Sequence, residues 1–223
     1  AAALFTTFNL VYGFFILPES LKKDKRRKFD LRRANPIGTL LSLKKYPLIT
    51  GLLVCIVLFN IAQHSTHSTW TFFTIEKFDW TEKLVGYSLG FIGLLAAIVQ
   101  GGLIRIIIPK FGNIKSVYLG MFFYIIGLFL FSIASEGWMV FAFAIPLSLG
   151  GISGPALQGI MTNKIPDDEQ GEFQGGMTSL VSLTAIIGPI LMTNLFSFFT
   201  SNDSSIYFPG APFVLAAILS IFG

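Results

Sequence analysis

The side chains best suited to bind a ligand lie in one polar stretch, residues 60–71, inside an otherwise apolar segment. If this stretch is helical, one stripe of its surface carries four polar residues: Asn60, His64, His67 and Thr71. Burying such groups against lipid without partners costs several kcal/mol. We therefore expect the stripe to face protein or a water-filled cavity.

Three interpretations of this stretch are open. It can line a substrate path, it can hold neighbouring helices together by hydrogen bonds, or His64 and His67 can bind a metal. Two histidines three residues apart with no nearby carboxylate or thiol are a poor zinc signature, so we predict no metal and no other cofactor. We favour the substrate path, whose candidates in this stretch are Asn60, Gln63, His64, His67 and Trp70.

A glycine-rich motif at residues 150–159 interrupts a later apolar segment. Pro155 frees a backbone carbonyl near Gly151 and so favours a bend. Gln158 is a further candidate for a cavity-facing amide, and Gly188-Pro189 predicts a bend in the next helix. Such bends suit helices that rock, although small residues also serve helix packing alone.

The turn at residues 100–112 combines glycines with basic residues. Its candidate gating or turn residues are Gly102, Arg105 and Gly112. A gating motif and a plain tight turn are equally good interpretations of this segment.

These residues must be positioned by helices that cross a membrane. Of the 223 residues, 53% are hydrophobic and 13% are charged, against roughly 25% charged in a soluble domain. Apolar runs of about 20 residues recur, each long enough to cross a hydrocarbon core of about 30 Å. The sequence predicts an all-α, polytopic membrane bundle with five full spans at about 48–75, 84–108, 116–135, 138–162 and 173–199.

Basic residues predict the orientation of the bundle. Of the 16 Lys and Arg residues, 14 fall in residues 20–46, 105–115 and 164, on one side of the predicted spans. Only Lys77 and Lys83 fall on the other side. The positive-inside rule then places residues 20–46 in the cytoplasm. The formal charge of +4 reflects these loops and does not indicate a nucleic-acid partner.

The order of segments matches the second half of a transporter built from two six-helix halves. Residues 1–17 are the expected end of helix six, and residues 18–47 the basic cytoplasmic central loop. Residues 48–223 are the expected C-terminal bundle, with helices seven to eleven and the start of helix twelve. The partners we expect are the lipid bilayer, a small-molecule substrate and a missing N-terminal six-helix half.

No Asp, Glu, Lys or Arg falls in the middle of a predicted span, although such residues usually mark proton relays and ion sites. If protons are the coupling ion, their carriers are expected in the missing half. No nucleophile–base pair, metal constellation or phosphate-binding loop occurs either, so we do not expect an enzyme. Cys55 is the lone cysteine and fits a small buried apolar position.

Several short stretches occur in an order and spacing typical of one family. They are Phe78-Asp79-Trp80, Gly86-Tyr87-Ser88-Leu89, Ser135-Glu136-Gly137-Trp138, Pro155-Ala156-Leu157-Gln158-Gly159, Gln170-Gly171-Glu172-Phe173-Gln174-Gly175 and Ile187-Gly188-Pro189. In them the chain resembles the TetA-like branch of the major facilitator superfamily, the tetracycline/proton antiporters. The resemblance implies efflux of a small drug-like molecule, driven by inward proton flow, through alternating access of two halves.

Two positions depart from that family pattern. Tetracycline antiporters of this branch carry a histidine in helix eight where this chain has Ala96, and an intramembrane aspartate in helix nine where it has Tyr124. A tyrosine, with a reference pKa near 10, does not release a proton at ordinary pH. Both departures remove a titratable group.

The leading hypothesis is a proton-coupled exporter of a small molecule, placed in a bacterial inner membrane. The alternative is an uncoupled facilitator or nutrient importer of the same fold, which the missing intramembrane acids favour. A distant alternative is a membrane receptor or enzyme without transport.

Overall fold

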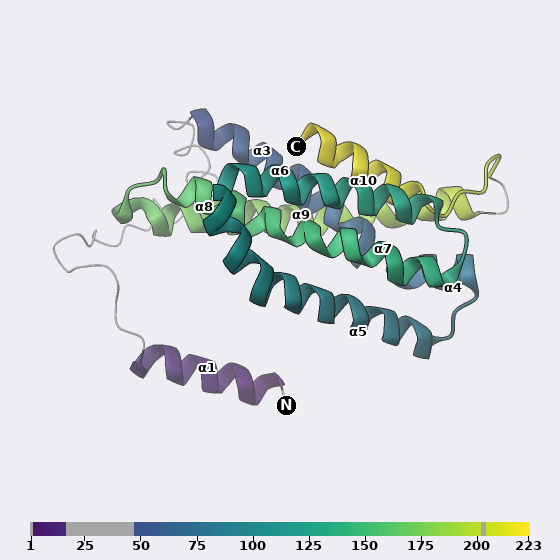
Figure 1. Ribbon diagram of the computed structural model, residues 1–223, viewed down its shortest axis with the longest axis horizontal. Coiled ribbons are helices and arrows are strands. Elements are labelled where there is room, and N and C mark those ends of the chain that lie inside the picture. The colour runs from purple at the N-terminus through teal and green to yellow at the C-terminus, as the bar shows by residue number, and fades with distance from the viewer. Residues whose placement is uncertain (1, 17–46, 202–203) are drawn as a thin grey trace.

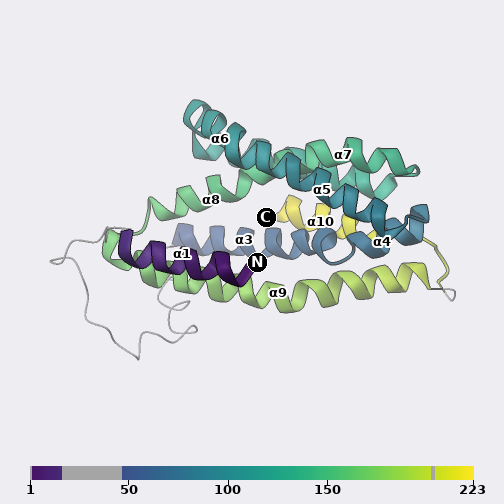
Figure 2. The same ribbon diagram turned by 90° about the horizontal axis from the view of Figure 1, so that it is seen from below.

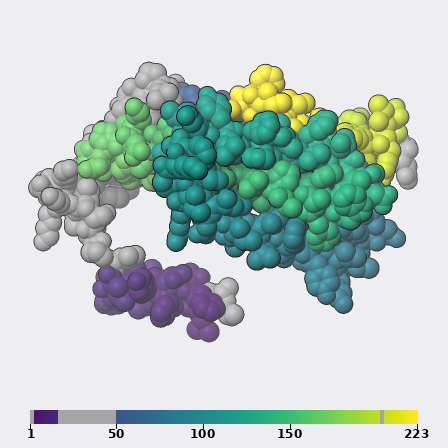
Figure 3. All heavy atoms as spheres, in the orientation of Figure 1, coloured from purple at the N-terminus to yellow at the C-terminus, as the bar shows by residue number. Residues whose placement is uncertain are grey.

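The computed structural model describes residues 2–16, 47–201 and 204–223, and within these ranges the regular structure is helical. Figure 1 shows a bundle of long, roughly aligned helices, with α1 (Ala2–Ile16) standing apart from it. The space-filling view in Figure 3 shows the same separation. The fold is therefore the predicted all-α bundle. Most of the predicted basic loop lies outside the described residues.

The first predicted span is two helices, α3 (Pro47–His67) and α4 (Trp70–Phe78). A turn at Ser68 and Thr69 separates them. The Thr69 hydroxyl donates to the Ser65 carbonyl, and Thr69 is fully buried. A local hydroxyl–carbonyl bond of this kind gives the backbone an alternative to a regular helix.

The second and third predicted spans are joined by a corner of one residue. The helix α5 (Glu82–Ile98) passes through a π-helical turn, η3 (Val99–Leu103), into α6 (Ile104–Ile133). Within α6, Gly112 has a φ of 77° and a ψ of 165°. Glycine adopts this left-handed φ without the steric cost that a Cβ imposes. The Ser116 hydroxyl donates to the Gly112 carbonyl at 2.7 Å and stabilises the first turn of the part of α6 that follows Gly112.

The glycine-rich motif also changes helix type. The helix α7 (Gly137–Leu149) tightens into a 3-10 turn, η4 (Gly150–Ile152), before α8 (Ser153–Thr162). After a second 3-10 turn, η5 (Asp167–Glu169), α9 (Gln170–Thr200) runs without interruption through Gly188 and Pro189. The chain ends with α10 (Ala211–Phe222). Figure 2 shows α9 along one side of the bundle, next to α3.

The connections alternate between the two ends of the bundle. The α4–α5 and α6–α7 connections and the adjoining ends of α9 and α10 lie at the right-hand end in Figure 1, whereas the junction of α5 with α6 and the α8–α9 connection lie at the left-hand end. By length and composition, three helical stretches among the described residues can cross a membrane: 82–133, 137–162 and 167–200. The corner at Gly112 divides the first of these into two arms.

Aromatic packing holds α4, α6 and α10 together. Phe73, Phe131 and Phe213 are fully buried. The Phe73 and Phe213 ring centroids lie 4.8 Å apart, and those of Phe131 and Phe213 lie 5.8 Å apart. Burying aromatic side chains with offset or edge-to-face geometry supplies packing beyond their buried area alone. This core fixes the helices whose other faces form the site.

Candidate functional site

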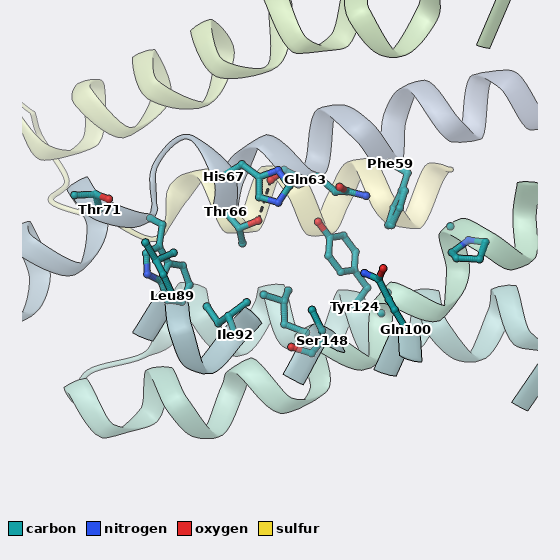
Figure 4. Close-up of a pocket in the computed structure, with 17 residues that line it drawn as sticks. Phe59, Gln63, Thr66, His67, Thr71, Leu89, Ile92, Gln100, Tyr124 and Ser148 are labelled. Carbon is teal, nitrogen blue, oxygen red and sulfur yellow. Dashed lines mark hydrogen bonds between the residues drawn. The ribbon is translucent and has the colours of Figure 1, made fainter. Parts of the chain in front are cut away.

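A cavity of about 610 Å³ opens between α3, α4, α5, α6, α7 and α8. Its volume falls in the range of roughly 300–1,000 Å³ that is usual for small-molecule sites. Seventeen residues line it (Figure 4). They are Phe59, Gln63, Thr66, His67, Trp70, Thr71, Leu89, Ile92, Ala96, Gln100, Tyr124, Leu147, Ser148, Gly150, Gly151, Gly154 and Pro155.

The face of α3 that lines this cavity carries Phe59, Gln63, Thr66 and His67. These positions recur every three to four residues, as one helix face requires. The Thr66 hydroxyl donates to the Gln63 carbonyl at 2.9 Å. Within the described part of the chain, no hydrogen bond reaches the Gln63 amide or the His67 ring, so both keep their bonding capacity for a ligand or water.

Two of the predicted stripe residues lie outside the cavity lining. The Asn60 amide donates to the Ile56 carbonyl at 2.9 Å, one turn back on its own helix. His64 packs against Gly188 of α9, where a Cβ would overlap its ring. The Ser68 hydroxyl and His64 Nδ1 are 3.4 Å apart. The stripe therefore divides: His67 and Thr71 reach the cavity, whereas Asn60 and His64 do not.

Trp70 lines the cavity but is held firmly within the core. Its indole Nε1 donates to the Ser88 hydroxyl of α5 at 3.0 Å, and Ser88 donates in turn to the Val85 carbonyl at 2.7 Å. Only 3% of Trp70 is exposed, and its ring packs on Phe131 with centroids 5.2 Å apart. Its polar atom is thus already satisfied, and Trp70 contributes a fixed apolar wall.

Tyr124 is a deeply buried side chain with a polar tip that also lines the cavity. It is 5% exposed, and its ring meets Phe59 edge-on with centroids 5.1 Å apart. Gly150 makes this position available, because a Cβ there would lie 2.6 Å from Tyr124 Cβ. In Figure 4 the phenol points across the cavity toward α3. Among the described residues its hydroxyl has no hydrogen-bond partner, and neither does the buried hydroxyl of Ser148.

Sequence reasoning did not select several of these lining residues. Gln100 lies one turn after Ala96 on the face of α5 that also carries Leu89 and Ile92, and this face continues into the π-helical turn. Ser148 is an isolated serine in an apolar helix, and Phe59 follows no polar pattern. Ala96 and Tyr124, noted above only as departures from a family pattern, both line this one cavity. Their spacing in sequence gave no sign of this proximity.

The cavity lining holds one imidazole, that of His67. No Asp, Glu, Lys or Arg is among the seventeen lining residues. In the described ranges there is also no group of three or more His, Cys, Asp or Glu residues placed to hold a metal ion. The site can therefore offer hydrogen bonds and aromatic surface, with no fixed charge.

The other predicted residues take varied positions. Pro155 lines the cavity, but Gln158 is exposed and outside the lining. Gly102 lies in the π-helical turn, Arg105 is exposed in the first turn of α6, and Gly112 forms the corner. Gly188 and Pro189 are in the middle of α9, away from the cavity lining.

Comparisons of this chain with known sequences all indicate the same protein family. The profile of the Major Facilitator Superfamily matches residues 1–189. The chain is 32% identical over 197 residues to the class C tetracycline resistance protein of Escherichia coli, covering 88% of this chain and 50% of that protein. It is 36% identical over 149 residues to the class E protein of Escherichia coli, covering 67% of this chain and 37% of that protein.

A more distant relative comes from an animal. Hippocampus abundant transcript-like protein 1 of Homo sapiens is 23% identical over 239 residues, covering 98% of this chain and 47% of that protein. The chain spans about half the length, or less, of these relatives. With its apolar helices it is an integral, multi-pass membrane protein. The chain belongs to the Major Facilitator Superfamily, in the branch of the tetracycline resistance proteins.

Proposed function

We propose that this chain is the C-terminal part of a secondary transporter that exports a small drug-like molecule, and that it is not an enzyme. The observation that carries the proposal is the cavity between α3, α5, α6 and α7, lined by aromatic rings and by polar groups with free bonding capacity. The names of the tetracycline resistance proteins support a drug-like cargo. The sequence similarity between this chain and those proteins supports export across the membrane as its mode of action.

The architecture we propose for the complete protein has two six-helix halves. Residues 1–17 are the end of helix six, residues 18–47 a central loop in the cytoplasm, and residues 48–223 helices seven to eleven with the start of helix twelve. A small-molecule substrate then passes between this half and an N-terminal half. We place the protein in a bacterial inner membrane.

Gln63, His67 and Trp70 are the substrate-path residues with the strongest support, because they line the cavity together. We propose Asn60, His64 and Gln158 as path residues only for the assembled transporter, since none of them lines this cavity. Gly102, Arg105 and Gly112 are the proposed gating turn, and Pro155, Gly188 and Pro189 the proposed bends.

The proposal also includes coupling of export to proton flow. The cavity lining contains no carboxylate, and two positions that are titratable in the tetracycline antiporters are Ala96 and Tyr124 here. Proton carriers are thus expected in the N-terminal half. The same lack of acids favours the second candidate, an uncoupled facilitator or nutrient importer.

The test is transport by the full-length protein in liposomes with an imposed pH gradient. Coupled export predicts that a transported compound dissipates the gradient, which a pH-sensitive dye inside the vesicles reports. Substrate movement without proton movement supports the facilitator. Transport of neither substrate nor protons, over a broad panel of compounds, contradicts a transporter.

A matched pair of variants tests the cavity. Gln63→Ala is expected to reduce transport several-fold, because the amide is lost from the lining. Gln174→Ala makes the same chemical change on α9, outside the lining, and should leave transport unchanged. Equal activity of both variants contradicts a role of this cavity.

A further inference from the structure

We propose that this cavity selects an uncharged, aromatic molecule whose acceptor group takes a hydrogen bond from the Tyr124 hydroxyl. The proposal rests on the function proposed above and names the class of substrate for that site. It starts from one unusual group, a phenol that is 5% exposed and has no partner among the described residues.

An unpartnered buried hydroxyl is costly, since a protein interior offers no water to replace the missing bond. The Tyr124 ring is held on two sides, by the edge-on contact with Phe59 and by the close approach of Gly150. Its direction is therefore fixed toward the cavity, as Figure 4 shows. A phenol in this setting can donate one hydrogen bond to whatever occupies the cavity.

The rest of the lining defines the complementary shape and polarity. Phe59 and Tyr124 offer aromatic surface, and Leu89 and Ile92 offer apolar surface from α5. Gln63 and Gln100 each bring an amide that can both donate and accept. An aromatic molecule that carries both a carbonyl and an N–H would offer an acceptor, a donor and apolar surface to these groups.

Charge is the property that the cavity should reject. A charged ligand would lose its hydration on entry, and none of the seventeen residues that line the cavity in this half is an Asp, Glu, Lys or Arg that could replace it. A neutral ligand has no such cost. The discrimination thus follows from missing countercharges and not from a steric barrier.

Three tricyclic compounds of nearly identical size provide the test. Acridone is neutral and carries a ring carbonyl and an N–H, 9-aminoacridine is a cation, and acridine-9-carboxylate is an anion. Binding of each compound to the purified full-length protein in detergent, at mildly alkaline pH, is followed by ligand fluorescence polarisation. We expect acridone to bind at least about tenfold more tightly than either ion.

The Tyr124→Phe variant removes only the donor and keeps the ring. We expect it to weaken acridone about fivefold to tenfold, the value of one neutral hydrogen bond, and to leave the weak affinities of the ions nearly unchanged. Tyr118→Phe is the matched control, because Tyr118 lies on the same helix, is 73% exposed and is outside the lining.

Several results would overturn the proposal. These are equal or tighter binding of an ion, equal acridone affinity in the Tyr124→Phe variant and wild type, and no saturable binding of any of the three compounds. Binding is measured without a membrane or gradient, so it is independent of transport. Transport of a cation by an active protein contradicts this inference alone, whereas selective acridone binding by a protein that transports nothing contradicts only the proposed function.

Discussion

The indole nitrogen of Trp70 lies 3.0 Å from the hydroxyl of Ser88, and this hydrogen bond ties α4 to α5 beside the cavity. Both residues are almost fully buried, at 3% and 1% exposure. Trp70 was a substrate-path candidate on sequence grounds. The bond adds a second role, because it fixes the distance between two walls of the cavity.

We therefore expect Ser88→Ala to destabilise the protein by about 1–3 kcal/mol, since it leaves a buried indole N–H without an acceptor. Thermal unfolding in detergent, followed by circular dichroism, measures the effect. Ser197→Ala is the control, because Ser197 is an exposed serine on α9 and should change stability by less than about 0.5 kcal/mol. An unchanged midpoint for Ser88→Ala would show that the bond contributes nothing.

The second prediction concerns the close contact between Gly150 and Tyr124. A Cβ at Gly150 would lie 2.6 Å from Tyr124 Cβ and 2.7 Å from its Cδ2. Gly150→Ala should force the ring to move, at a cost of about 1–3 kcal/mol, and should weaken acridone binding. Unfolding and fluorescence polarisation measure the two effects.

Gly51→Ala is the control for this substitution. Gly51 lies on α3, and a Cβ there would meet nothing within 4 Å. If Gly150→Ala binds acridone as wild type does, the position of the Tyr124 ring does not determine affinity.

A third prediction addresses the contact between α3 and α9. A Cβ at Gly188 would overlap the His64 ring, so Gly188→Ala should separate these helices and cost about 1–3 kcal/mol. Gly175→Ala, on the same helix with nothing within 4 Å, should be neutral. Adding His64→Ala to Gly188→Ala should recover part of the loss, as a double-mutant cycle would measure. Simple additivity of the two changes would contradict a direct clash.

The fourth prediction is that the folding stability depends on pH in the alkaline range. The group responsible, Tyr207, lies at the end of the bundle, outside the membrane spans. The Tyr207 hydroxyl donates to Glu76 Oε1 at 3.2 Å, joining the α9–α10 connection to α4. Desolvation raises the pKa of Tyr207 above its ordinary value, and the charge and hydrogen bond of Glu76 raise it further. A raised pKa means that the folded protein holds this proton more tightly than the unfolded chain does.

The contribution of Tyr207 to stability is then fully present below the unfolded pKa of about 10, and it is lost as the pH rises through the higher folded value. Melting curves of wild type and Tyr207→Phe should differ by a constant amount up to about pH 10 and converge above it. A difference that grows with alkaline pH would show the opposite sign and contradict the assignment.

Much of the fold follows from sequence patterns. The apolar runs predict a helical bundle, which the structure has, and the Gly112 corner falls between the predicted span ends at 108 and 116, where a glycine tolerates that φ. The glycine-rich motif predicts a bend near Gly151, and the structure has a 3-10 turn at Gly150–Ile152. Because each successive helix runs back along the bundle, successive connections lie at opposite ends of it.

Other features could not be predicted from local patterns. The break at Ser68 and Thr69 turns the chain within a single predicted span, because a hydroxyl–carbonyl bond competes with the helix. The π-helical turn at Val99–Leu103 has no signal in the apolar pattern of the sequence. Ala96 and Tyr124 are 28 positions apart in sequence, and only the packing of α5, α6 and α7 brings them to one cavity.

The one-residue corner at Gly112 has a mechanical consequence for a transporter. Two membrane-length arms meet at this residue with no slack between them. Because one residue joins the two arms, a displacement of either arm along its axis is passed directly to the other. Inserting flexible residues at this point would uncouple the arms while leaving every contact in the cavity intact.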